Sequence, residues 1–178
     1  DIVIAATGAA PIVPAIPGIE GDNVVMALDS YGIEAQMSDS IVVVGGGQVG
    51  CETALHLAGL GKKVTICEML DTLAPDASQT HKDEINWELK HCENVSILTS
   101  SICKSINPEG IEYTDSDGNL KSVSCGTVII AVGMKPAAET AESFSETAKS
   151  RFFSIGDCSS VGTVETAIKS AYYTAVHI

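Results

Sequence analysis

Basic residues and aromatic residues are both scarce in this chain of 178 residues. Lysine and arginine number 10 against 23 acidic residues, which gives a formal net charge of -13. Nucleic acids and anionic membrane surfaces bind clusters of Lys and Arg, so we expect neither as a partner. Aromatic residues make up 4% of a chain that is 45% hydrophobic. A core built from small aliphatic residues favours layered α/β packing.

The cysteine spacings that mark redox and metal sites are also missing. None of the six cysteines forms a C-x-x-C or C-x-x-x-x-C pair, so we expect no redox dithiol, zinc site or iron–sulfur site. Cysteines in apolar runs indicate reduced structural thiols and a cytoplasmic protein. No apolar run approaches the ~20 residues of a membrane span. The chain opens on DIVIAATG, inside a predicted strand, so we expect a piece of a longer protein.

Hydrophobic periodicity predicts alternating strands and helices. Buried strands are expected at residues 1–7, 41–44, 64–67, 95–98, 128–132 and 152–155, and helices at 48–60, 79–92 and from about 164. Three short runs with turn residues between them predict an antiparallel meander at 102–106, 111–113 and 120–124. Residues 24–37 are weakly patterned and are assigned a short helix. Residues 9–21 contain three prolines and are interpreted as a linker.

Two segments far apart in the chain resemble each other. IVIAATGAAP (2–11) and VIIAVGMKP (128–136) each run from an apolar strand into Gly-x-x-Pro. In open α/β sheets ligands collect at the carboxyl ends of strands, so both exits could border a ligand. Gly and Pro also favour any exit from strand to loop, and the pattern alone leaves the two interpretations equally open.

The segment IVVVGGGQVGCETALHLAGLGKKVTICE carries the strongest motif. Gly45-x-Gly47-x-x-Gly50 follows a strand, opens a helix and lies within a βαβ unit, which is the context of a dinucleotide-binding loop. Gly45 makes the tight turn, Gly47 allows the backbone to approach a pyrophosphate, and Gly50 allows close packing of helix and strand. The loop residues Gly46, Gln48 and Val49 complete the expected phosphate site at the helix start. A Rossmann-like domain that binds nothing, or binds S-adenosylmethionine, remains an alternative.

Glu68 ends the second strand of this unit, 18 positions past Gly50. A carboxylate accepts hydrogen bonds from a ribose 2′-OH and repels a 2′-phosphate. The chain's single arginine, Arg151, is distant in sequence. The pattern therefore favours NAD(H) over NADP(H).

Glu52, near the start of the helix, has two interpretations. It is either an acid that complements the helix dipole or a polar contact to the nicotinamide end of the cofactor. His56, His81 and His91 lie in helical stretches with no nucleophile beside them. Solvated or capping roles are expected for these histidines, and no residue is assigned to catalysis.

Four blocks in this order resemble the pyridine nucleotide–disulfide oxidoreductase superfamily. They are DIVIAATGAAPIVPAIPGIEG, then IVVVGGGQVGCETALHLAGLGKKVTICEML, then TVIIAVGMKP, and then FFSIGDC followed by ETAIKSAYYTAVHI. Within the superfamily the chain is most similar to the C-terminal part of the 2,4-dienoyl-CoA reductase / enoate reductase / NADH:flavin oxidoreductase group. The expected class is therefore an α/β, Rossmann-like FAD/NAD(P)-binding fold: a parallel sheet with helices on both faces plus a three-stranded antiparallel meander.

The resemblance implies how the chain is divided and which cofactors it meets. Residues 1–29 and 137–178 are similar to pieces of an FAD lobe, and residues 30–136 to the NAD(H)-binding domain inserted into it. Asp157, with Gly156 before it, matches the residue that hydrogen-bonds the FAD ribityl chain. Gly133 matches a border of the NAD site, and Glu52 matches a glutamate near the nicotinamide.

Family features outside these blocks imply that the chain acts within a larger protein. A second G-x-G-x-x-G for FAD, the FMN and iron–sulfur barrel of the group, and the redox cysteine pair of the disulfide reductases are not in this sequence. We therefore expect an NAD(H) module that passes a hydride from NADH to FAD, with the remaining FAD lobe and the FMN/iron–sulfur barrel as partners in the same parent chain. Alternatives are a non-catalytic nucleotide sensor and the NADH oxidase or ferredoxin/rubredoxin reductase branches. Alone, the chain should be inactive, bind NADH weakly and retain no FAD.

Overall fold

The computed structural model describes residues 2–148 and 151–178, with only the backbone of Glu146 and Thr147. The chain divides into two compact units. The central unit is Val13–Gly133, and the terminal unit combines Asp1–Ile12 with Met134–Ile178. These divisions fall earlier in the chain than the predicted lobe boundaries after residues 29 and 136. The assignment of the units to NAD and FAD lobes stays a prediction.

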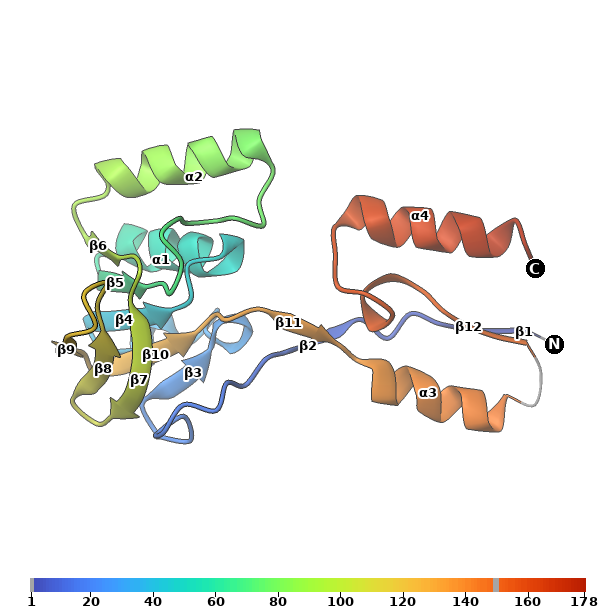
Figure 1. Ribbon diagram of the computed structural model, residues 1–178, viewed down its shortest axis with the longest axis horizontal. Coiled ribbons are helices and arrows are strands. Elements are labelled where there is room, and N and C mark those ends of the chain that lie inside the picture. The colour runs from blue at the N-terminus through green and yellow to red at the C-terminus, as the bar shows by residue number, and fades with distance from the viewer. Residues whose placement is uncertain (1, 149–150) are drawn as a thin grey trace. The chain divides into compact units, whose positions relative to one another are not determined.

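The central unit is built on a five-stranded parallel sheet in the order β3-β10-β4-β5-β6 (Figure 1). The strands are β3 (Val24–Met26), β4 (Ser40–Val44), β5 (Lys63–Cys67), β6 (Val95–Leu98) and β10 (Thr127–Ile130). Helix α1 (Gln48–Gly59) connects β4 to β5, and α2 (Gln79–His91) connects β5 to β6. The central strands are short β-branched runs buried on both faces, as the sequence predicts.

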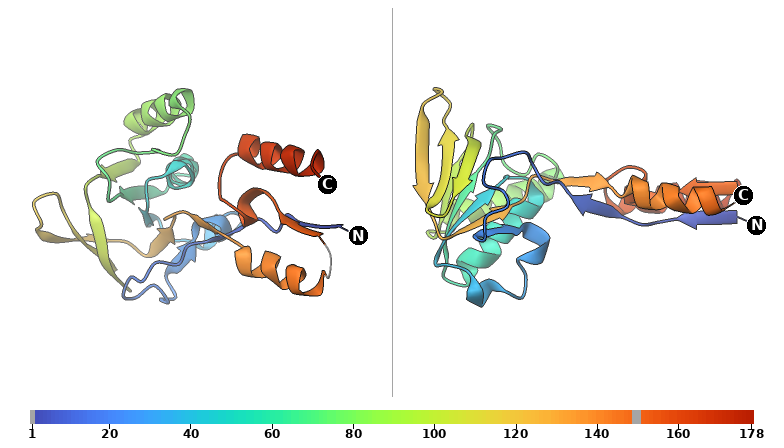
Figure 2. Two further views of the ribbon diagram at one scale, coloured as in Figure 1. Left: turned by 45° about the vertical axis from the view of Figure 1, so that its right-hand side comes forward. Right: turned by 90° about the horizontal axis from the view of Figure 1, so that it is seen from below.

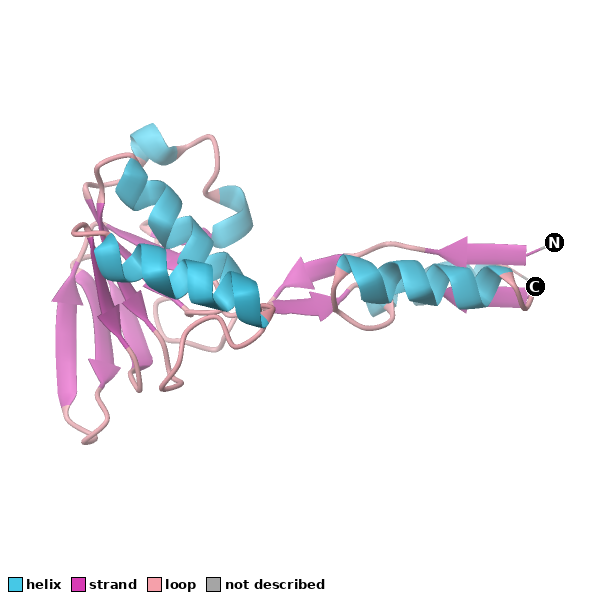
Figure 3. Ribbon diagram, turned by 90° about the horizontal axis from the view of Figure 1, so that it is seen from above, coloured by secondary structure: helices cyan, strands magenta, loops and turns pink. Residues whose placement is uncertain are grey.

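The two faces of this sheet are covered by different layers. Ile41 and Val43 pack in one core cluster with Leu57 of α1 and Ile85 of α2. The intervening positions of β4 pack in a second cluster with the meander, which consists of β7 (Ile102–Asn107), β8 (Gly110–Thr114) and β9 (Leu120–Ser124). Figures 2 and 3 show the helices and the meander on opposite faces of the sheet. Alternate residues of one strand thus serve two cores.

The terminal unit consists of two strand pairs and two helices. β1 (Ile2–Ala5) pairs in parallel with β12 (Arg151–Ser154), and α3 (Ala138–Thr147) and α4 (Val164–Ala175) lie on opposite sides of this pair (Figure 1). β2 (Ala9–Pro11) pairs antiparallel with β11 (Met134–Pro136). A 3-10 turn, η3 (Gly156–Cys158), follows β12.

The β2–β11 pair joins the two segments that resemble each other in sequence. Met134 lies opposite Pro11, and Pro136 lies opposite Ala9. The glycine before each strand has a positive φ, 75° at Gly8 and 107° at Gly133. The linker assignment for residues 9–21 was therefore wrong at Ala9–Pro11. Proline is tolerated because a two-stranded sheet consists only of edge strands.

Two further elements differ from the sequence prediction. The short helix assigned to 24–37 is wrong, because Val24–Met26 pair with β10 and only two 3-10 turns follow, η1 (Ala27–Asp29) and η2 (Glu34–Gln36). Helix α3 was not predicted. Val49 in the first turn of α1 and Leu60 just after its last residue are apolar but 41% and 55% exposed. In the described part of the chain, no helix has the length and apolar character needed to cross a membrane.

Candidate functional site

The glycine loop between β4 and α1 is closely packed against its neighbours. Gly45 has φ of 107° and donates its N–H to the Cys67 carbonyl at 2.9 Å. A Cβ on Gly45 would collide with the carbonyl oxygen of Ala131, and a Cβ on Gly50 would collide with the carbonyl oxygen of Gly45. The roles expected for these two glycines, a tight turn and close helix–strand packing, follow directly from these contacts.

The Glu68 side chain packs directly against the glycine loop and is hydrogen-bonded to its backbone. Its side chain is 6% exposed, and its carboxylate accepts the Gly46 N–H at 2.5 Å and the Leu70 N–H at 2.7 Å. A Cβ on Gly46 would come within 2.9 Å of the Glu68 Cβ and 2.5 Å of Leu73 Cδ2. Glu68 therefore holds the loop to the carboxyl end of β5. Since an ionised carboxylate offers about four lone-pair sites, it can accept further bonds from a ligand.

Asp76 is a site residue that the sequence analysis missed. Its Oδ1 accepts the Gln48 N–H, the first of α1, at 2.9 Å. The helix's own N-cap residue, Gly47, supplies no side-chain bond. The three atoms nearest to a Cβ added to Gly47 would all belong to the Asp76 carboxyl group, with each oxygen at 3.5 Å. No spacing rule connects Asp76 with the glycine motif, and only the fold brings them together.

Glu52 joins the starts of α1 and α2. It accepts a bond from Gln48 Nε2 at 3.0 Å and lies 2.8 Å from His81 Nε2, while the other ring nitrogen of His81 is 3.4 Å from Glu84. The hydrogen bonds to Glu52 and then Glu84 raise the pKa of His81. Glu52 lies past the first turn of α1, so the helix-dipole interpretation loses support. His81, expected to be solvated or capping, lies against a predicted site residue.

The environment of the loop is acidic and apolar. Asp76, Glu68 and Glu52 all act on the buried Cys51 thiol, whose pKa is raised to about 12, mainly by burial. Among the described residues, no Lys or Arg side chain pairs with any of these three carboxylates. The six cysteines are free, and burial also raises the pKa of Cys67 to about 12. Such thiols stay protonated near neutral pH and are poor nucleophiles.

The remaining predicted site residues follow other strands. Gly133 comes three positions after Ile130, the residue of β10 that pairs with Val44 at the end of β4. The chain at Gly133 therefore leaves the sheet at the carboxyl ends of the strands, where the glycine loop also begins. Gly156 and Asp157 belong to the terminal unit and form part of a separate groove.

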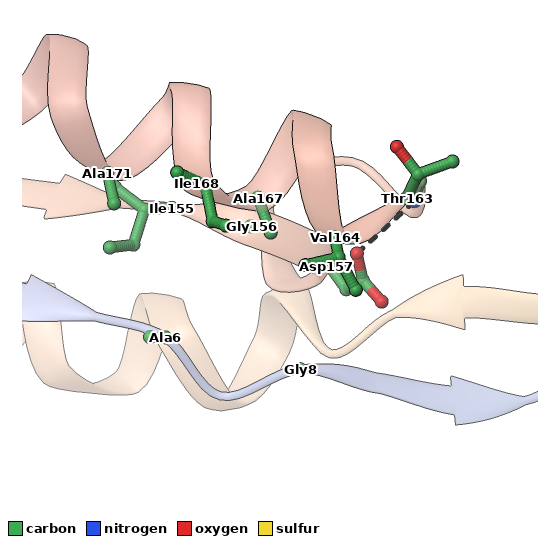
Figure 4. Close-up of a pocket in the computed structure, with 11 residues that line it drawn as sticks. Ala6, Gly8, Ile155, Gly156, Asp157, Thr163, Val164, Ala167, Ile168 and Ala171 are labelled. Atoms are coloured by element: carbon green, nitrogen blue, oxygen red, sulfur yellow. Dashed lines mark hydrogen bonds between the residues drawn. The ribbon is translucent and has the colours of Figure 1, made fainter.

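The groove in the terminal unit has a volume of about 490 Å³. It lies between the exit of β1 and the start of α4, and Figure 4 shows Asp157 at the N-terminal end of that helix. Asp157 Oδ1 accepts the Gly162 N–H at 3.2 Å. Thr163 caps α4 in a reciprocal pair of bonds with Thr166. The groove therefore combines a carboxylate with apolar walls and a helix N-terminus.

Comparison with known proteins gives one consistent result. A family model described as pyridine nucleotide-disulphide oxidoreductase matches residues 1–171. Over the whole length of this chain, the sequence is 32% identical to an NADH oxidase of Thermoanaerobacter brockii. The match covers 28% of that NADH oxidase. The chain is 30% identical to a bilirubin reductase of Mediterraneibacter gnavus, with 98% of the chain and 27% of that protein covered.

A solved structure of a 2-naphthoyl-CoA reductase bound to 2-naphthoyl-CoA has the same fold. Its TM-score is 0.91 at 26% identity, with 100% of this chain and 27% of that chain covered. The predicted α/β, Rossmann-like class with a parallel sheet and an antiparallel meander is confirmed. The expected helices on both faces are not found at the five-stranded sheet of the described chain, where the meander covers the second face because it connects β6 to β10 in place of a helix. The chain spans about a quarter of the length of each of these proteins.

Proposed function

The chain belongs to the pyridine nucleotide-disulphide oxidoreductase family, and we propose that it is the NAD(H)-binding module of a flavin-dependent oxidoreductase. In the parent protein a hydride passes from NADH to FAD, and electrons continue to an FMN and unsaturated-substrate site of the dienoyl-CoA or enoate reductase kind. The observation that carries the proposal is the glycine loop held over the buried carboxylate of Glu68. The oxidoreductase names of the relatives support the same class.

The pyrophosphate of NADH is assigned to the loop between β4 and α1. The atoms nearest to a Cβ on Gly47 would be those of the Asp76 carboxyl group, and the N–H groups of Gln48 and Val49 begin the helix. Such N–H groups have no intrahelical partner and bind anions. Val49 is 41% exposed, which leaves this end of α1 accessible. Gly45 and Gly50 shape the cradle through their packing.

Glu68 is assigned to the adenine ribose and Glu52 to the nicotinamide side, with Gly133 at the border of the site. The Glu68 carboxylate can accept ribose hydroxyl hydrogens while it keeps its bonds to Gly46 and Leu70. The lack of a recorded cationic partner for Glu68 in the described chain disfavours a 2′-phosphate. NADH is therefore the proposed donor.

The groove of the terminal unit is assigned to part of FAD, with Asp157 on the ribityl chain and Gly156 allowing close approach. The residues fit, because a carboxylate with one recorded bond faces a groove of about 490 Å³. FAD, when bound, would supply the hydride acceptor, while this chain positions and orients it. Retention of FAD would need the remaining FAD lobe. The free thiols, four of which are buried, fit a cytoplasmic protein.

Full-length protein tests the class of function. We expect it to purify with flavin and NADH to reduce that flavin in stopped-flow absorbance, whereas a nucleotide sensor would carry no flavin. An NADH oxidase would need no further organic acceptor and would consume oxygen at the flavin-reduction rate.

Calorimetry with NADH and NADPH on the chain tests the donor. NADH should bind weakly but more tightly than NADPH. Glu68→Gln should narrow the gap by about three- to tenfold, because it removes one charge near the 2′ position and keeps an acceptor for Gly46. Tighter NADPH binding by the unmodified chain would refute the assignment.

A further inference from the structure

The segment of residues 69–78, between β5 and α2, covers the glycine loop and is called the strap below. Its inner part is anchored. The Ala74 N–H donates to the Gly46 carbonyl at 2.7 Å, and Leu73 and Ala74 are 5% and 0% exposed. Ala74 also has φ of 45°, a backbone conformation that non-glycine residues rarely adopt. Burial and the bond to Gly46 hold it there.

The outer part of the strap begins at Pro75 and places Asp76 on the Gln48 N–H. That N–H opens α1, and a pyrophosphate on a dinucleotide loop uses the same group. One N–H cannot make two good hydrogen bonds, so the carboxylate and a phosphate oxygen compete for it. The side chain of Asp76 is exposed, which leaves it room to move away.

We propose that Asp76 is an internal stand-in for the phosphate, and that it must leave the Gln48 N–H before NAD(H) can bind. This inference rests on the proposed nucleotide function and adds a regulatory contact to it. The anchored residues Leu73, Ala74 and Ala77 stay in place, and the exposed side chain of Asp76 carries the movement. Affinity for NADH is thereby kept below what the loop alone would give.

The charge around the loop supports the same inference. Glu52 and Glu68 are close enough to influence the Cys51 thiol together with Asp76. Like charges oppose a dianionic pyrophosphate, and Asp76 is the one of the three whose carboxylate contacts the N–H of Gln48. Displacing it removes one negative charge from the phosphate position.

The test uses the full chain and Asp76→Asn, which keeps a capping oxygen and loses the charge. Asp71→Asn is the matched control, because it removes the same charge from the strap at an exposed position with no recorded side-chain bond in the described chain. Asp76→Asn should lower the NADH dissociation constant by about three- to tenfold, and Asp71→Asn by less than about twofold. Equal effects of the two changes, or weaker binding by Asp76→Asn, would overturn the proposal.

Inorganic pyrophosphate separates this inference from the proposed function. In a titration followed by the amide NMR signal of Gln48, half-saturation should come at lower pyrophosphate in Asp76→Asn than in the unmodified chain. If that holds while no form binds NADH, the strap contact stands and the nucleotide function fails. If NADH binds but the Gln48 signal of both forms responds alike to pyrophosphate, the function stands and the strap contact fails.

Discussion

The central and terminal units differ most in how much core each contains. The central unit has two clusters of buried aliphatic residues, with Val42, Leu57 and Ile66 at 0% exposure. In the described part of the terminal unit the buried cluster is Ala5, Ala141 and Cys158, and α4 buries none of its residues. Apolar burial is the main favourable term in folding. The glycine loop thus lies on an extensive buried core, and the Asp157 groove on a thinly packed layer.

The two units also differ in how the N-terminus of a helix is capped. In α4, Thr163 and Thr166 cap the helix from three residues apart. In α1 the cap is Asp76, from 28 residues away. A local cap forms with the helix itself, whereas a distant cap depends on the folded unit, which is what allows the proposed exchange of Asp76 for a phosphate.

The largest effect should come from deleting core volume in the central unit. Leu57→Ala should lower the free energy of unfolding by about 2–5 kcal/mol, because a cavity replaces a side chain that is 0% exposed. Ile168→Ala on α4, at 63% exposure, should change it by less than about 0.5 kcal/mol. Urea unfolding followed by circular dichroism measures both. Similar losses for the two variants would break the comparison between the units.

The next largest effects are expected from alanine substitution of two glycines with positive φ, one in each unit. Gly45→Ala adds a collision with the Ala131 carbonyl to backbone strain, so NADH binding should be lost. Gly8→Ala in the terminal unit meets nothing within 4 Å, and strain alone should cost about 1–2 kcal/mol. Calorimetry and thermal unfolding of both variants test this. NADH binding by Gly45→Ala at the unmodified affinity would contradict the packing described for the loop.

Removal of the local cap should have a smaller effect confined to α4. Thr163→Ala should destabilise that helix by about 1 kcal/mol, because the Thr166 N–H loses its acceptor. Faster amide hydrogen exchange in Val164–Ala175, with unchanged exchange in α1, is the expected result. The exposed Val161→Ala serves as a neighbouring control. An effect that spread to the central unit would show that the two units unfold together.

The smallest expected effect is a pH dependence within the central unit. Hydrogen bonds to Glu52 and Glu84 raise the folded-state pKa of His81 above its unfolded value of 6.5. Its stabilising contribution is complete below that value and is lost as pH rises through the folded pKa. His81→Gln should flatten this part of the profile, measured by thermal unfolding between about pH 5 and 9. His91→Gln, on the same helix, should leave the slope in place.

The stability of the central unit should also depend on pH in the acid range. The Gly32 N–H, and then bonds within its own turn and to His56, lower the pKa of Glu34 from 4.5 to about 2. Its contribution is present above the unfolded value and is lost as pH falls towards 2. Glu34→Gln should therefore weaken the acid loss of stability, with Glu20→Gln as the control.

Local sequence by itself determined the elements of the loop. The apolar run Ile41–Val44 predicts the strand, the glycines predict the turn and the start of the helix, and the carboxylate of Glu68 predicts the side on which a cofactor ribose would bind. These features can be predicted because strand burial and turn geometry depend on neighbouring residues. The turns of the meander were predictable for the same reason. The binding roles of these residues stay predictions.

Only the tertiary structure decided which distant residues meet. The pairing of Pro11 with Met134, the contact of His81 with Glu52 and the bond from Gln48 to Asp76 join positions with no shared periodicity. Local residue propensity does not predict β3, because Val24–Met26 form a strand only by hydrogen bonding to β10. Such contacts form when the chain's layers pack, so the loop was visible in the sequence and the carboxylate that occupies it was not.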